Sequence, residues 1–150
     1  MMPSSIWTPS REDLARLRSV VQQAEERTSG EIRVHLEAHC REDVLDHAAF
    51  IFHKLKMDQT ALRNGVLLYL ALKDRKFAVL GDVGIHRVVA PDFWDNIYQE
   101  GIRCFQHGDF VLGLESAIRA CGQALEQHFP ATEGQGNELI DDVSWEGGTK

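Results

Sequence analysis

The side chains best suited to chemistry in this sequence are oxygen donors that lie beside glycine or proline. Asp82 stands in the segment GDVG, where a carboxylate can direct its oxygens at a hard cation such as Ca2+. Two more carboxylates and a side-chain amide occupy comparable positions. We therefore expect a site for calcium or another divalent cation, with these candidate ligands in order of preference: Asp82, Asp92, Glu31 and Asn64.

Each candidate also has a structural explanation that involves no ligand. Asp82 can bond its own backbone in an Asx turn. Asp92 follows a proline and suits the first turn of a helix, where a negative charge contributes about 0.3–1 kcal/mol. Asn64 precedes a glycine, which is a common turn, and Glu31 at the start of a strand can simply be solvated. The residue pattern leaves both explanations open.

Two neighbouring side chains would serve a reaction on a phosphate. The planar fork of Arg63 suits phosphate oxygens, although it can equally pair with Asp58 or Asp82. His86 can act as a general acid or a zinc ligand. No nucleophile stands out, because Ser29 lacks an elbow motif and the seven histidines contain no HxH or HExxH spacing.

Hydrophobic periodicity predicts the elements that position these residues. The unbroken apolar run at 65–72 is typical of a central strand covered on both faces, whereas residues 31–38 alternate strictly and predict a strand nearer the edge with one polar face. Helical spacing and capping residues mark the other elements. The predicted order is αβαββαα, with helices from Ser10, at 42–56, from Pro91 and from Asp109, and strands at 31–38, 65–72 and 77–80.

This order predicts an α/β protein with a three-layer, Rossmann-like α/β/α sandwich around a small mixed sheet. A helical crossover makes the first two strands parallel, and a tight turn makes the third antiparallel to the second. The starts of the first two strands and the end of the third then share one sheet edge. We therefore expect the loops 29–31, 63–65 and 81–84 to converge there.

The chain length of 150 residues suits one domain. We place the domain at 10–130, after a loosely held segment at 1–9. Residues 131–150 are polar and glycine-rich and are expected to form a flexible tail. Four apolar residues in that tail leave open that it docks as a strap: Leu139, Ile140, Val143 and Trp145.

Composition excludes several classes of protein. The net charge is −7 with basic residues scattered among acids, so no nucleic-acid footprint is expected. The three cysteines form no CxxC pair, which argues against a disulfide framework. No apolar run approaches the ~20 residues that a transmembrane segment needs. We expect a soluble, cytoplasmic protein.

Three blocks of this sequence resemble the conserved blocks of the TPM domain family: TSGEIRVHLE, RNGVLLYLALKDRKFAVLGDVGIH and HGDFVLGLESAI. The resemblance covers about residues 10–129. It implies a Rossmann-like α/β/α sandwich that binds calcium or another divalent cation in an acidic depression. It also implies a link to acid phosphatase activity, attributed to a plant member, or to photosystem repair and receptor assembly in other members.

Two departures from the family pattern matter. Most members are exported or anchored in a membrane, with a transmembrane helix or a glycine-rich tail. We expect neither in this chain, which resembles a short soluble bacterial subgroup. Many members read GYGLE where this chain reads GDVGIH, so the carboxylate is displaced.

Together these observations favour a non-catalytic domain that binds a divalent cation and couples it to an unidentified protein partner. The alternative is a metal-assisted acid phosphatase, in which Asp82 and Asp92 hold the metal and Arg63 or His86 steadies the phosphate. A scaffold without a ligand is the third reading. Nothing in the pattern indicates the oligomeric state.

Overall fold

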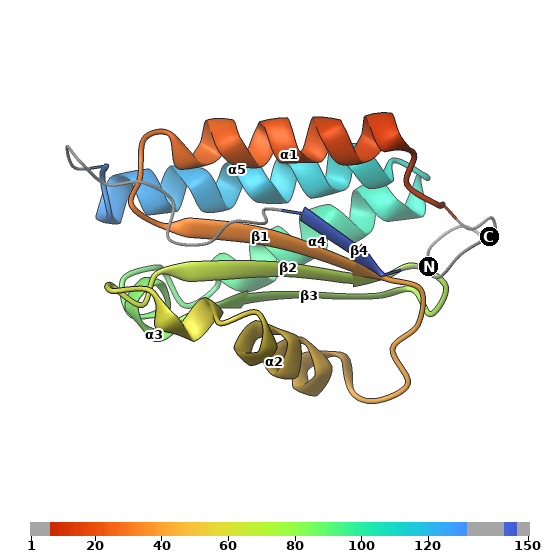
Figure 1. Ribbon diagram of the computed structural model, residues 1–150, viewed down its shortest axis with the longest axis horizontal. Helices are drawn as coiled ribbons and strands as arrows, with labels where there is room; N and C mark the ends of the chain where they lie inside the picture. The colour runs from red at the N-terminus through yellow and green to blue at the C-terminus, as the bar shows by residue number, and fades with distance from the viewer. Residues whose placement is uncertain (1–6, 132–142, 147–150) are drawn as a thin grey trace.

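The computed structural model describes residues 7–131 and 143–146, which form one four-stranded mixed sheet with helices on both faces (Figure 1). The strand order is β3-β2-β1-β4, and the predicted α/β sandwich is confirmed. In chain order the elements are α1 (Arg11–Glu25), β1 (Glu31–Glu37), α2 (Val44–Lys54), η1 (Met57–Gln59), β2 (Gly65–Ala71), β3 (Lys76–Gly81), α3 (Val83–His86), α4 (Phe93–Gln106), α5 (Phe110–His128) and β4 (Val143–Glu146).

Helices α1, α4 and α5 cover one face of the sheet, and α2 covers part of the other (Figure 1). Every residue of β2 is buried, as the apolar run predicted, because alternate side chains enter the two layers. Leu68 packs into the larger core on the α1 side, while Leu67 and Tyr69 pack into the smaller core beneath α2.

Local signals in the sequence explain where several helices begin. Ser10 caps α1: its Oγ accepts from the Asp13 N–H at 3.0 Å, and the Asp13 carboxylate accepts from the Ser10 N–H at 3.0 Å. Asp109 precedes α5 as predicted, but its side chain makes no capping hydrogen bond to the helix. The short stretch after Asp82 forms the four-residue helix α3.

The strand β1 lies inside the sheet, not near its edge as predicted. It pairs in parallel with β2 on one side and with β4 on the other. The side chains that were expected to face solvent are therefore covered: Arg33 is 8% and His35 2% exposed. Strict alternation predicted the polar character of this face, but it could not predict that the face is buried.

The strand β4 comes from the segment assigned to a flexible tail. Val143 aligns with Val34 and Trp145 with Leu36, which places both on the α1 side of the sheet. Val143 is 3% exposed and belongs to the larger core. The domain boundary expected at residue 130 therefore leaves out one strand of the sheet.

Residues 139 and 140, the other two apolar positions of the expected strap, lie outside the described residues, as do residues 1–6 of the N-terminal segment. Trp7, just before α1, stacks on Phe110 with ring centroids 5.3 Å apart. Among the described residues, no helix has the length and hydropathy to cross a membrane.

Candidate metal centre

A polar cluster forms where β4 joins the sheet on the α2 side. His35 and Glu37 are two residues apart on β1, so their side chains leave the same face of the strand. The parallel register places Ser144 beside His35 and Glu146 beside Glu37. Three ionisable groups from two strands therefore meet on one surface of the sheet.

The distances in this cluster suit a bound cation. His35 Nε2 lies 3.6 Å from Glu146 Oε2 and 3.8 Å from Glu37 Oε2. The three ligand atoms all lie within 4.8 Å of one another, and no other such group of three occurs within residues 7–131 and 143–146. Ligands of a tetrahedral zinc ion at about 2.1 Å lie roughly 3.4 Å apart, so only small shifts would close the site around an ion.

The imidazole of His35 is held in an orientation that leaves one nitrogen available. Nδ1 lies 2.5 Å from the Ser144 hydroxyl oxygen, whereas Nε2 has no hydrogen-bond partner among the described residues. When Nδ1–H donates to Ser144, the lone pair of Nε2 points toward the two carboxylates. Metal-binding histidines commonly have their second ring nitrogen fixed in this way.

Burial lowers the pKa of His35, against the opposing influence of Glu37 and Glu146, and the positive charge of Arg33 adds to the lowering. The ring is therefore neutral at neutral pH, which is the form that binds metals. A neutral ring cannot itself neutralise the carboxylates that face it, and the Glu37 carboxylate is instead paired with His47 through its Oε1.

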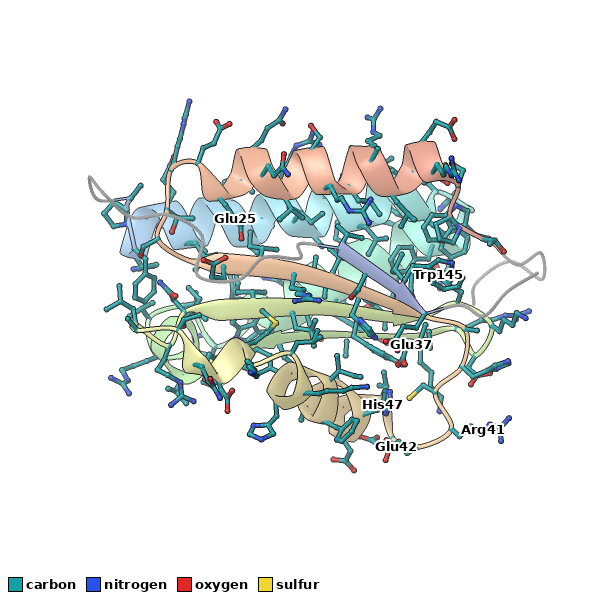
Figure 2. The ribbon with its side chains drawn as sticks, viewed as in Figure 1. Glu25, Glu37, Arg41, Glu42, His47 and Trp145 are labelled. Carbon is teal, nitrogen blue, oxygen red and sulfur yellow. The ribbon has the colours of Figure 1, made fainter. Side chains whose placement is uncertain are left out.

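Two further side chains orient Glu37. Its Oε1 accepts hydrogen bonds from the Tyr69 hydroxyl at 2.6 Å and from His47 Nε2 at 2.7 Å, and His47 Nδ1 is in turn bonded to Glu42 at 2.6 Å. Figure 2 shows His47 on α2 below Glu37 at the end of β1. These bonds occupy Oε1 and leave Oε2 facing His35.

The same contacts keep the carboxylate of Glu37 ionised. Burial works to raise its pKa, but the hydrogen bonds from Tyr69 and His47 outweigh burial and hold the pKa below its usual range. For Tyr69, burial and the bond to Glu37 raise the pKa of the phenol, so it remains a donor.

One imidazole nitrogen and two carboxylate oxygens suit ions that accept mixed ligands, such as Zn2+ or Mn2+. Calcium prefers oxygen ligands alone. Three protein ligands leave at least one coordination position open, and the Glu146 side chain is 55% exposed, so water can reach the cluster.

The three loops predicted to converge do meet at the opposite end of β1. Asn64 Nδ2 donates to Ser29 Oγ at 3.3 Å, and the Gly84 N–H donates to the Arg63 carbonyl at 2.8 Å. Gly84 is sterically required, because a Cβ there would lie 2.2 Å from the Leu62 carbonyl oxygen. The topological argument from strand order is correct at this edge.

The carboxylate of Asp82, the preferred candidate ligand, is bonded to an arginine at this edge. Arg63 Nε donates to Oδ2 at 2.7 Å and Nη2 donates to Oδ1 at 2.9 Å, while Oδ1 also accepts from the Val83 N–H at 2.8 Å. The pairing with Arg63 is one of the structural alternatives that the sequence left open. A cation at Asp82 would have to compete with this guanidinium.

The remaining candidates lie in different surroundings. Asn64 is buried, and its Oδ1 has no hydrogen-bond partner among the described residues, whereas Asp92 is exposed and makes no capping bond to α4. Glu31 is 2% exposed at the start of β1. His86 accepts a hydrogen bond from Trp94 Nε1 at 3.0 Å. Cation binding by these residues stays a prediction.

Sequence reasoning did not select the three residues of the cluster. The strand alternation already placed His35 and Glu37 on one polar face, and that was the available signal. Glu146 stood in the expected tail, and no local motif connects it with β1. His35 and Glu37 lie four and six residues along β1 from Glu31 at the loop edge, roughly 13–20 Å at ~3.3 Å per residue.

Comparison with known proteins finds relatives that share this architecture. The family model described as TPM domain matches residues 10–124. The BA42 protein of the psychrophilic bacterium Bizionia argentinensis, solved by NMR, is 41% identical over 93% of this chain and 96% of its own, with a TM-score of 0.84. The N-terminal domain of the cg2496 protein of Corynebacterium glutamicum shares the fold at 10% identity and a TM-score of 0.61, over 88% of this chain and 80% of its own. Among curated proteins, none matches the chain.

Proposed function

The chain belongs to the TPM domain family, and from that premise we propose that it is a divalent-cation-binding, non-catalytic interaction domain whose ligands are His35, Glu37 and Glu146. The family resemblance suggests a cation, and the side chains of the cluster suggest where it binds. The protein partner that such a domain would serve is not identified by any residue described here.

One observation carries the proposal: the buried Nε2 of His35 faces two carboxylate oxygens and has no hydrogen-bond partner among the described residues. A buried polar atom without a partner costs about 1–3 kcal/mol. The facing carboxylates add mutual repulsion. A cation between the three groups would remove both costs, since it accepts the nitrogen lone pair and neutralises the carboxylates.

Two more specific functions, calcium binding at the loop edge and phosphatase activity, have less support. Calcium at the loop edge would use Asp82, whose two oxygens already accept from Arg63. A metal-assisted phosphatase would need a phosphate-binding side chain beside the metal. The two residues named for that task, Arg63 and His86, belong to the loop edge, roughly 13–20 Å along β1 from the cluster.

Isothermal titration of the tag-free full chain with ZnCl2, MnCl2 and CaCl2 tests the proposal. We expect zinc or manganese to bind with one-to-one stoichiometry and more tightly than calcium. His35→Gln should weaken binding at least about tenfold, because it removes the nitrogen ligand. The matched control is His53→Gln, which changes a histidine that is 78% exposed and paired with Asp58.

Two results would contradict the assignment of ligands. If none of the three cations binds the full chain, the scaffold reading is correct. If binding persists unchanged in His35→Gln but is lost in Asp82→Asn, the cation binds at the loop edge instead. Circular dichroism of each variant shows that it is folded before it is titrated.

A further inference from the structure

We propose that the cation acts as a clasp that holds β4 against β1, so that metal binding and docking of the C-terminal strand are coupled. This inference rests on the proposed function, because it concerns the same three ligands. Two of them come from β1, and the third, Glu146, comes from β4. A site divided in this way is complete only when β4 is docked.

The strand β4 is the shortest of the four described strands. It is four residues long and pairs with one neighbour, β1, at the edge of the sheet. Arg18 Nη2 donates to the Val143 carbonyl at 3.5 Å, which is at the long limit for a hydrogen bond. Short edge elements of this kind open locally at a lower free energy than the core of a domain.

The side chains on the two faces of β4 make different contacts with the sheet. Val143 and Trp145 face the α1 side and contribute apolar contacts. Ser144 and Glu146 face the cluster, where Ser144 contacts His35 Nδ1 and Glu146 Oε2 approaches His35 Nε2. Apolar packing therefore holds the strand without a cation, and the cation adds a second attachment through Glu146.

Thermodynamic linkage makes this coupling reciprocal. If docking of β4 supplies a ligand, the docked form binds the cation more tightly, and the bound cation must favour docking by the same factor. Undocking would leave β1 as an edge strand with unpaired backbone groups, the geometry that captures an extended segment by strand addition. Cation release would thus raise the population in which this strand edge is open.

The test combines amide hydrogen exchange with metal titration on the full chain. Zinc chloride is the probe, and NMR follows the amides of Ser144 and Trp145. We expect saturating zinc to slow exchange at these two amides by about tenfold or more, with little change in α5. Glu146→Gln should bind zinc about tenfold or more weakly and should lose the zinc effect on exchange.

Glu126→Gln is the matched control, because it changes a half-exposed glutamate on α5, outside the cluster. Failure of the proposed function appears when none of zinc, manganese and calcium binds the unchanged chain. If zinc binds the unchanged chain but Glu146→Gln binds it equally well, the clasp is overturned together with the assignment of Glu146 as a ligand, while cation binding itself stands. Zinc binding without slower exchange at Ser144 and Trp145 overturns the clasp too, because the strand is then docked independently of the ion.

Discussion

Val143→Ala tests whether β4 is a packed part of the domain. The side chain is 3% exposed and belongs to the larger core. The substitution removes two methylene equivalents at about 0.8 kcal/mol each, and the residual cavity adds to that loss unless the neighbours collapse into it. We expect a loss of about 1–2 kcal/mol in the free energy of unfolding, and roughly 3–8 °C in Tm.

Local opening sets an upper limit on this loss. If β4 can undock while the rest of the domain stays folded, the substitution cannot cost more than the free energy of docking. A loss near the lower end of the range would therefore measure how weakly β4 is held. Urea denaturation followed by circular dichroism gives the global value, and amide exchange at Ser144 gives the local one.

The matched control is Val83→Ala, because Val83 is 50% exposed. Its cost should stay within about 0.5 kcal/mol of the unchanged chain. If Val143→Ala costs no more than this control by both measurements, then β4 does not pack against the core. In that case the clasp and the metal centre lose their structural basis, since Glu146 depends on β4 for its position.

Three further predictions concern the rest of the domain. Leu68→Ala should cost about 2–5 kcal/mol in urea melts, because the side chain is fully buried in the central strand, and a cost under ~1 kcal/mol would contradict the layered core. Asp82→Asn should lower Tm, because the carboxylate accepts both hydrogen bonds from Arg63, and an unchanged or higher Tm would indicate repulsion among carboxylates instead. Asp74→Asn should destabilise the protein at pH 7 and progressively less below about pH 4. The reason is that hydrogen bonds from His39 and a backbone N–H lower the folded-state pKa of Asp74. The stability that Asp74 contributes is therefore present above its unfolded-state pKa of about 3.9 and is lost as the pH falls through the folded-state pKa. A destabilisation that did not vary with pH would refute this assignment.

Much of the fold could be predicted because its signals are local. The apolar run at 65–72 identified the central strand, which the structure has at Gly65–Ala71, and the short separation from the run at 77–80 identified the β2–β3 turn. Ser10 and the acidic residues after it marked the start of α1. Strand order then brought Arg63 and Asp82 together without any further information. In each case, the signal lay in residues close in sequence or in a short connection, which left few possible structures for the segment.

The candidate metal centre depends on a contact that no local signal encodes. His35 and Ser144 are 109 positions apart, and a parallel edge strand has no tight turn to set its register. The pattern of Val143 and Trp145 in a polar stretch suits a docked strap and a solvated tail equally well. The segment docks as a strand only if an open strand edge and an apolar surface are available to it. Only the assembled sheet supplies both. The sequence alone therefore identifies the core strand β2, the helices α1, α2, α4 and α5, and the loop edge. Burial of His35 and the position of Glu146 follow from tertiary packing, because both require β4 to cover β1.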